Sequence, residues 1–274
     1  MTSRAAVKRW FPPALIDVWR RRNGTWSGLD VSSSLSPASI HEAGYADPLI
    51  LNRVETATRD ALRGRTRYER DGLAFDDADV YWPVLGPLMA VRRGSPGVLR
   101  VLDIGGSLGS KWLQHRDWME LLSPLQWAVV EQPHYVDRAA QLNYPETLSF
   151  HASISQAHDS MSGVDVALFS SSLQYFESPS ETLREAIDTA EQAVVLDRVT
   201  VWNEERDTLG WQAVALYDRP ARYPCWLMSW PGIVREVGQR FHSVGTWREN
   251  LSYSIYPPQT DAFFGGVFGF GRRV

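Results

Sequence analysis

Residues 101–110 read VLDIGGSLGS, and the interpretation of the whole chain starts from this stretch. An apolar run ends in an acid, Asp103, and the glycines Gly105, Gly106 and Gly109 follow it. Glycine adopts positive φ without a Cβ clash and lets a ligand approach the backbone closely. The helix that should follow offers unpaired N–H groups at its start. The stretch therefore predicts a cradle for a nucleotide-like ligand, although a purely structural turn can use the same residues.

From residue 98 onward, segments of strand and helix character alternate. Apolar runs predict strands at 98–105, 125–132, 148–153, 165–176 and 192–201. Helical patterns lie between them, near 110–122, 135–143 and 178–190. This alternation indicates βαβ units and a mainly parallel sheet covered by helices on both faces. After a further helix at 229–241, we expect the aromatic segments 251–257 and 261–273 to pair as an antiparallel hairpin at one edge.

The first 97 residues lack this alternation. The segments 12–22 and 47–65 carry apolar residues at helical spacing, with a loop rich in small polar residues between them. A further helical stretch at 76–94 is interrupted by prolines. We therefore divide the chain into a helical, substrate-binding cap over residues 1–97 and a catalytic domain over residues 98–274.

Composition and charge exclude several classes of protein. The net charge is −4, so no overall basic field favours nucleic acid or an anionic membrane as a partner. The single cysteine, Cys225, excludes an internal disulfide and fits a reducing, cytoplasmic location. No apolar run approaches the roughly 20 residues that span a bilayer. The residue patterns support no metal site, and the abundance of aromatic residues permits a homodimer without requiring one.

Polar residues follow the predicted strands where each strand ends. Glu131 ends the second strand, where a carboxylate roughly 20 residues on commonly accepts ribose hydroxyls in nucleotide-binding folds. The third strand ends in Ser153, and the apolar part of the fourth ends in Ser170 and Ser171. Open α/β sheets bind ligands at the carboxyl ends of their strands. These residues are therefore predicted to lie around one ligand.

The glycine pattern narrows the choice of ligand. The dinucleotide fingerprint G-x-G-x-x-G, the phosphate-binding G-x-x-x-x-G-K-[ST] and the hydrolase G-x-S-x-G are all absent from the sequence. A short-chain reductase needs a Tyr-x-x-x-Lys pair, and neither Lys8 nor Lys111 follows a tyrosine at that spacing. An acid before a glycine loop and a second acid ending the next strand are features of class I S-adenosylmethionine-dependent methyltransferases, which the chain resembles over about residues 98–274.

The resemblance can be narrowed further by short motifs. The segments YERDGLAF, LDIGGSLGSKWLQ, VVEQPHYV, SSSLQYFESP, LDRVTV and RYPCWLMS occur in an order similar to that of a methyltransferase family defined by a GGSLGS motif I and an EQP motif II. The resemblance implies a Rossmann-like class I methyltransferase sheet and S-adenosylmethionine as donor, with S-adenosylhomocysteine as product. It implies that the donor is held by Asp103, Gly105, Gly106, Ser107 and Gly109, its ribose by Glu131, and its adenine near Gln132 and Ser153. We add Ser170 and Ser171 to this cofactor set.

Candidate catalytic and substrate residues come from the cap and the strand ends. Asp71, between a charged and an apolar segment, is predicted to face the cleft, with a turn or helix cap as the alternative. Gln174 and Tyr175 follow the fourth strand, beside the expected methyl group. The substrate-binding candidates are Tyr81, Arg198, Tyr223 and Trp226. An internal ion pair with Asp197 is the alternative for Arg198, and core packing is the alternative for the two aromatic residues Tyr223 and Trp226.

Methyl transfer from a sulfonium is an in-line displacement whose rate depends largely on alignment. A general base is needed only where the acceptor must lose a proton. We expect O-methylation of a small natural-product or saccharide intermediate, with the choice of oxygen resting on how common such acceptors are. The alternative is a non-catalytic regulatory protein that binds S-adenosylmethionine or S-adenosylhomocysteine. It predicts binding of the donor without turnover.

Overall fold

The computed structural model describes residues 27–32, 35–36, 48–77, 79–214, 221–259 and 261–272. Its main sheet has a parallel centre with strand order β6-β5-β4-β7-β8. These strands are β4 (Leu99–Ile104), β5 (Leu125–Val130), β6 (Leu148–His151), β7 (Val166–Ser170) and β8 (Ala193–Trp202). At one edge β13 (Phe263–Arg272) runs antiparallel to β8, and β11 (Phe241–Glu249) runs antiparallel to β13. The predicted α/β class, with a mostly parallel Rossmann-like sheet and antiparallel pairing at one edge, is confirmed.

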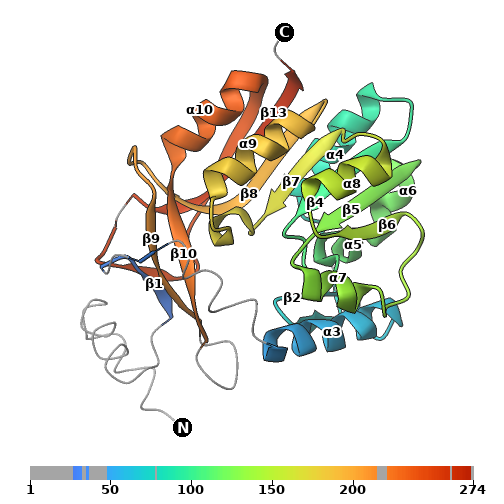
Figure 1. Cartoon of the computed structure of the whole chain (residues 1–274), viewed down its shortest axis with the longest axis horizontal. Helices are drawn as coiled ribbons and strands as arrows, with labels where there is room; N and C mark the ends of the chain where they lie inside the picture. The colour runs from blue at the N-terminus through green and yellow to red at the C-terminus, as the bar shows by residue number, and fades with distance from the viewer. Residues whose placement is uncertain are drawn as a thin grey trace.

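Two layers of helices cover the two faces of this sheet (Figure 1). On one face α8 (Ile154–Met161), α9 (Pro179–Thr189) and α10 (Trp230–Arg240) contribute to one hydrophobic core. On the other face α4 (Trp82–Gly94), α5 (Ser110–Gln114) and α6 (Met119–Leu122) contribute to a second core. Strands buried on both faces are apolar along their whole length, which explains the continuous hydrophobic runs in the sequence. The strand order reverses beside β4, so its carboxyl end lies at the point where such sheets bind ligands.

The expectation that the segment 251–257 pairs with the segment 261–273 at the sheet edge was wrong. The segment at 251–257 contributes β12 (Ser254–Tyr256), which pairs in parallel with β1 (Gly28–Asp30) and not with β13. The strand beside β13 is β11, whose polar residues hid it from the search for apolar runs. Trp247 of β11 lies opposite Gly266, and a Cβ at Gly266 would collide with the indole ring. The glycines of β13 therefore match the large side chains of its true partner.

A further group of strands extends the sheet at the lower left of Figure 1. It consists of β12, β1, β9 (Thr208–Val214) and β10 (Ala221–Ser229), and β10 pairs in parallel with the end of β8 at Val201 and Trp202. The sequence analysis did not predict β9 or β10. These strands bury a small core of their own that includes Leu29, Cys225 and Ile255.

The expected helical cap also contains strands. Residues 48–62 form α3 (Pro48–Leu62), but β2 (Tyr68–Arg70) and β3 (Leu73–Phe75) form a hairpin and β1 joins the sheet extension. Helix α4 packs against β7, β8 and β13 and is therefore a layer of the main sheet. The helix expected at 12–22 lies outside the described residues. The boundary at residue 97 stays a proposal.

The helix expected at 110–122 is broken into α5, a 3₁₀ turn η2 (Arg116–Trp118) and α6. The break occurs at His115, whose buried ring accepts a hydrogen bond from the backbone N–H of Tyr81 at Nε2, 3.3 Å away. Nδ1 of the same ring donates to the carbonyl of Lys111 at 2.9 Å. Burial lowers the pKa of His115 to about 4, so the ring is neutral and fixes the start of α4 against α5.

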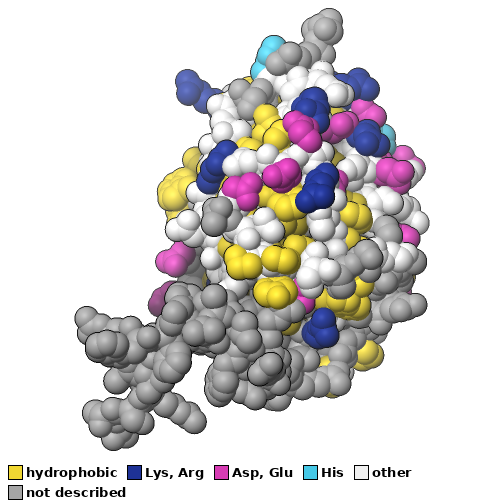
Figure 2. Space-filling model, turned by 90° about the vertical axis from the view of Figure 1, so that its left-hand side faces the viewer, with side chains coloured by type: hydrophobic (Ala, Val, Ile, Leu, Met, Phe, Trp, Pro, Cys, Tyr) yellow, Lys and Arg dark blue, Asp and Glu magenta, His cyan; other side chains and the backbone are white. Residues whose placement is uncertain are grey.

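The surface is of mixed charge where Figure 2 colours its side chains. Acidic and basic side chains are interspersed in the upper half of that face, with hydrophobic side chains between and below them. Ion pairs between Arg184 and Glu236 and between Arg240 and Asp188 join α9 to α10. Within the described residues, no helix is both long enough and apolar enough to cross a membrane. In the same part of the chain, His, Cys, Asp and Glu side chains form no group of three or more that could hold a metal.

Candidate functional site

The glycine loop joins the end of β4 to α5. Gly105 has a φ of 74°, and its N–H donates to the carbonyl of Val130 at 2.9 Å. A Cβ at Gly105 would lie 2.5 Å from Cβ of Ser172, and one at Gly106 would lie 2.5 Å from Oδ2 of Asp103. The loop therefore needs glycine both for its conformation and for the space around it.

Asp103 lies beneath this loop and is almost fully buried. Its Oδ2 accepts a hydrogen bond from Nε1 of Trp127 on β5 at 3.2 Å. Burial raises the pKa of Asp103 to about 7, against the opposing effects of Trp127 and Lys111. In this geometry Asp103 positions the loop from below, and its predicted contact with a donor stays a prediction.

Glu131 connects the loop to the end of β5. Its Oε1 accepts a hydrogen bond from the N–H of Ser107 at 3.0 Å, and its Oε2 accepts one from the N–H of Gln132 at 3.0 Å. Ser107 has a φ of 55°, a backbone conformation that residues other than glycine rarely adopt. The structure therefore brings together the glycine loop and the acid that the sequence placed one strand later. Gln132 immediately precedes α7 (Pro133–Ala139), and its adenine contact is not tested by these bonds.

The serines of the predicted cofactor set have bonds within the protein. Ser153 caps α8 by accepting a hydrogen bond from the N–H of Gln156 at 3.2 Å. Ser170 donates to Oδ2 of Asp197 at 2.9 Å. Ser171 has a φ of 59°, and its N–H donates to the carbonyl of Asp197 at 2.8 Å. The end of β7 is thereby tied to the middle of β8, while contacts of these serines with a cofactor stay predictions.

A β-bulge shapes the part of β8 next to this site. Asp197 and Arg198 together lie opposite Gly266 of β13, because the pairing register shifts by one residue there. Arg198 has a φ of 52°. Bulges turn side chains toward a new direction and are common beside active sites. Here the bulge presents Asp197 and Arg198 to residues from three other elements.

These residues form a continuous chain of polar contacts, which we call the carboxyl-end network. The hydroxyl oxygen of Tyr81 lies 3.0 Å from Oδ1 of Asp197 and 3.0 Å from Oε1 of Glu249. Glu249 pairs with Arg198 at 2.6 Å, and Nε1 of Trp247 donates to Oδ1 of Asp197 at 3.3 Å. With the Ser170 bond to Asp197, the members are Tyr81, Ser170, Asp197, Arg198, Trp247 and Glu249. The internal ion pair considered for Arg198 exists, but its partner is Glu249 and not Asp197.

The titration of the network is shifted by burial. Asp197 is fully buried, and burial raises its pKa, while Lys111 and the hydrogen bonds from Ser170 and Tyr81 act in the opposite direction. Burial and the two nearby carboxylates raise the pKa of Tyr81, so its hydroxyl keeps its proton. Lys111, in the first turn of α5, places its ammonium 4.5 Å from the centroid of the Tyr81 ring. Burial lowers the pKa of Lys111, which sequence analysis had considered only as a reductase residue.

The hairpin of β2 and β3 docks onto the glycine loop through Glu69. This fully buried carboxyl accepts hydrogen bonds from the hydroxyl of Ser110 and, at 3.2 Å, from the N–H of Gly72. Burial raises the pKa of Glu69 to about 7. Sequence analysis missed Glu69, because an acid within the charged run Y-E-R-D looks like a surface residue. No alternation along the strand could have indicated it, because the neighbouring Tyr68 is buried as well.

Asp71 lies in the turn of the same hairpin with a φ of 53°. Its side chain is exposed to solvent. The surrounding protein raises the pKa of Asp71, and the positive charges of Arg70, Lys111 and Arg198 act in the opposite direction. The turn considered as the alternative for Asp71 is real, since the residue joins β2 to β3. Its predicted position facing the cleft stays a prediction.

The other candidates divide among three places. Gln174, in the turn η3 (Leu173–Tyr175), donates to the carbonyl of Arg198 at 3.4 Å, and its buried Oε1 has no hydrogen-bond partner among the described residues. Tyr175 donates to Oε1 of Gln212 at 2.9 Å and packs against the ring of Tyr223 in the sheet extension. Trp226 donates to the carbonyl of Phe176 at 3.0 Å and packs on the core under α9 and α10.

Tyr223 and Trp226 lie on opposite faces of β10, because side chains alternate along a strand and the two positions differ by an odd number. Their predicted roles in substrate binding stay predictions. Tyr81, Arg198 and Gln174 gather where the carboxyl end of β7 meets the bulge in β8, whereas Tyr175 and Tyr223 belong to the sheet extension.

Comparison with known proteins gives distant matches only. No protein-family model matches the chain, and no curated protein matches it. Among solved structures, the N-terminal domain of EvdMO1 in the presence of S-adenosylhomocysteine (SAH) and D-fucose has a TM-score of 0.46 and 16% identity, covering 82% of this chain and 100% of that domain. Magnesium protoporphyrin IX methyltransferase (ChlM) from Synechocystis PCC 6803 with bound SAH has a TM-score of 0.42 and 14% identity, covering 99% of this chain and 100% of ChlM.

The [4+2]-cyclase SpnF has a TM-score of 0.42 and 17% identity, covering 81% of this chain and 77% of the cyclase. At such distances the function has to be argued from the residues of this chain. The family suggested by the GGSLGS and EQP motifs stays a prediction.

Proposed function

We propose that the protein is an S-adenosylmethionine-dependent methyltransferase that acts on a small molecule, with oxygen of a natural-product or saccharide intermediate as the methyl acceptor. The observation that carries this proposal is the convergence of Glu131 with the glycine loop, where Oε1 lies 3.0 Å from the N–H of Ser107. A carboxylate at the end of the strand after a glycine loop is the group that accepts ribose hydroxyls in related folds.

The residues present fit a nucleoside donor of this kind. Gly105 and Gly106 leave no space for side chains of their own, so backbone would face the ligand there. Glu131 would hold the ribose, and Gln132 and Ser153 are candidates for the adenine. When bound, S-adenosylmethionine supplies a methyl group on a positively charged sulfur. The chain's own part is to align the acceptor with that group and exclude competing water.

The first test is calorimetry with S-adenosylmethionine, SAH and NADH as separate ligands. We expect the first two to bind and NADH not to bind. The variant Glu131→Gln should bind SAH about 10- to 100-fold more weakly, since charge-assisted hydrogen bonds of about 1.5–3 kcal/mol are weakened. Glu205→Gln, at an exposed ion pair with Arg235, is the matched control and should bind SAH as the wild type does.

Turnover separates this function from a regulatory one. Transfer of a radiolabelled methyl group from S-adenosylmethionine is measured against a panel of hydroxylated small molecules, including glycosides, phenols and hydroxy acids. Product formation supports the enzyme. Binding of both sulfur nucleotides without any transfer favours the non-catalytic alternative, and absence of binding by both removes the basis of the proposal.

A further inference from the structure

The hydroxyl of Tyr81 carries one proton and faces two carboxylates. Its oxygen lies 3.0 Å from Oδ1 of Asp197 and 3.0 Å from Oε1 of Glu249. A phenol has one O–H donor and can otherwise only accept. With both carboxyls ionised, one of the two contacts therefore has no proton in it. One additional proton on either carboxyl would complete the hydrogen bonding.

We propose that Glu249 takes a proton from the methyl acceptor and passes it through Tyr81 to Asp197, which makes Glu249 the catalytic base and the other two its positioning residues. This inference rests on the proposed function. Of the two carboxylates in the network, Glu249 is the one that the acceptor can reach, since about a third of its side chain, 32%, is exposed. Asp197 is fully buried, and its contact with Glu249 runs through Tyr81.

The surroundings favour transfer in this direction. Glu249 stays paired with Arg198 at 2.6 Å when the proton moves on, so its charge remains compensated. On Asp197 the proton neutralises a buried charge, which is costly to keep ionised. Burial raises the pKa of Asp197 in agreement with this direction. The charged and titratable groups around the pair are Tyr81 from the start of α4, Lys111 from α5, Arg198 from β8 and Asp71 from the hairpin turn.

The relay predicts the chemical class of the acceptor. It must have a proton to lose, which selects a hydroxyl over a carboxylate. In the step, the acceptor O–H bond breaks as its oxygen bonds to the methyl carbon. The carbon–sulfur bond breaks with its electron pair left on sulfur, giving a neutral thioether. The released proton goes to Glu249, the Tyr81 proton goes to Asp197, and Tyr81 is re-protonated from Glu249.

The relay is tested first without any ligand, by carbon-13 NMR of the Asp and Glu carboxyls through a pH titration. We expect Asp197 to titrate above the ordinary value of about 3.9 for aspartate. Glu249→Gln should lower the pKa of Asp197 by about 1 unit, because a nearby negative charge is removed. Tyr81→Phe removes the hydroxyl that contacts both carboxyls. In a Tyr81→Phe background, Glu249→Gln should therefore shift the pKa of Asp197 less. Glu205→Gln, as control, should leave Asp197 unchanged.

Two results would overturn the relay. One is a pKa of Asp197 that stays the same in Glu249→Gln. The other is an equal shift on Glu249→Gln with and without Tyr81, which would mean coupling through space alone. SAH calorimetry on the same variants keeps the two proposals apart. Absence of SAH binding overturns the proposed function and the base role with it, whereas SAH binding with uncoupled carboxyls overturns only the relay.

The acceptor found by the transfer screen provides the kinetic test. Tyr81→Phe should lower kcat about 100-fold with KM and the SAH Kd within twofold of wild type, since proton transfer is typically worth that much. The wild-type rate should rise with pH through the pKa of Asp197, and Glu249→Gln, which removes the base, should lose this limb. An acceptor atom with no proton to lose, or an unchanged kcat in Tyr81→Phe, contradicts the relay.

Discussion

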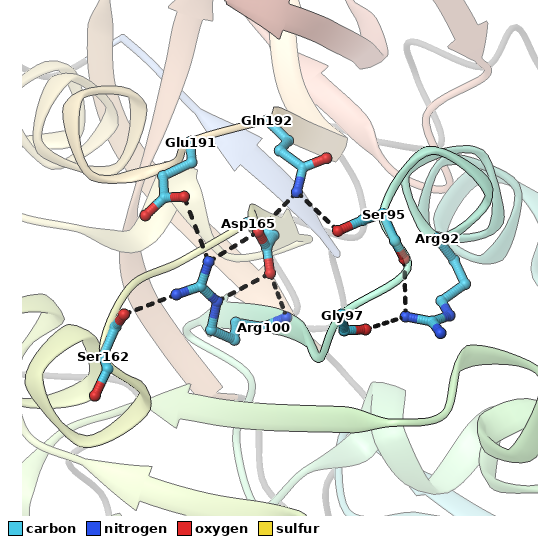
Figure 3. Close-up of polar contacts among 8 residues, drawn as sticks. All are labelled: Arg92, Ser95, Gly97, Arg100, Ser162, Asp165, Glu191 and Gln192. Carbon is cyan, nitrogen blue, oxygen red and sulfur yellow. Dashed lines mark hydrogen bonds and ion pairs between the residues drawn. The ribbon is translucent and has the colours of Figure 1, made fainter.

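The two ends of the central sheet carry polar clusters of opposite character. At the amino end, Asp165 accepts hydrogen bonds from Arg100 at Nε and Nη2, both at 3.1 Å, and from Gln192 at 2.7 Å (Figure 3). Arg100 also donates to the carbonyl of Ser162 and pairs with Glu191. Burial of Asp165 opposes its ionisation, but the bonds from Arg100 and Gln192 outweigh it and lower its pKa. The charges of this cluster are compensated within the cluster.

At the carboxyl end of β7, Asp197 of β8 accepts hydrogen bonds from Tyr81, Ser170 and Trp247 and forms no ion pair among the described residues. Burial raises its pKa. Ser171 and Arg198 adopt positive φ there, and Gln174 has a buried oxygen without a hydrogen-bond partner among the described residues. Strain and shifted pKa values cluster at functional sites. The amino end therefore stabilises the fold, whereas the carboxyl end keeps groups in the states that binding and proton transfer need.

The largest expected effect breaks the amino-end cluster. Asp165→Ala removes the carboxylate that accepts two hydrogen bonds from the guanidinium of Arg100. Removing one partner of a buried ion pair lowers the free energy of unfolding by about 3–5 kcal/mol. Because a fifth of the Arg100 side chain, 21%, remains exposed, we expect the lower end of that range. Urea unfolding measures the loss. SAH affinity of the folded variant should not change, and a selective loss of SAH binding would contradict the separation of the two ends.

The second prediction concerns the glycine loop. Gly105→Ala places a Cβ 2.5 Å from Cβ of Ser172 at a φ of 74°, so the loop must move. We expect SAH binding to weaken by about 30-fold or more, equivalent to about 2 kcal/mol, with a stability loss of about 1–2 kcal/mol. Gly94→Ala is the matched control, since a Cβ there meets nothing within 4 Å. Wild-type SAH affinity in Gly105→Ala would show that this loop does not hold the donor.

The third and smallest effect is a pH dependence of stability. Glu69 has a pKa of about 7 in the folded protein against 4.5 in the reference state, so the folded state binds more protons between these values. The contribution of Glu69 to stability is therefore fully present below pH 4.5 and is lost as the pH rises through 7. Between pH 5 and pH 8, the free energy of unfolding should fall by about 1–2 kcal/mol less in Glu69→Gln than in the wild type.

Urea unfolding at the two pH values measures this change, with Glu205→Gln as a control at an exposed carboxyl. A fall of the same size in Glu69→Gln and wild type would mean that Glu69 does not titrate in this range. Asp103, whose pKa is also raised to about 7 by burial, should then be examined by Asp103→Asn.

Most strands of the main sheet could be predicted because burial on both faces makes them apolar throughout. The same criterion missed β9, where half-buried positions alternate with buried ones, and β11, where exposed positions alternate with half-buried ones. It also led to the wrong partner for β13. Of the site, Glu131 and the glycine loop were found because their spacing along the chain reflects a local strand–loop–helix unit. Glu69, Lys111 and Glu249 were missed because charged residues in a sequence look like surface residues until their partners are known.

The sequence by itself determined the order of the parallel strands β4 to β8 and the helices between them, the glycine loop after β4 and the acid at the end of β5. These depend on local propensity, periodicity and short spacing. Only the tertiary structure decided that Tyr81 meets Asp197 and Glu249, which lie 116 and 168 positions away along the chain. That meeting depends on the bulge in β8, the register of β13 and the break before α6 that fixes His115. No local pattern encodes such contacts, because they follow from how separate elements pack together.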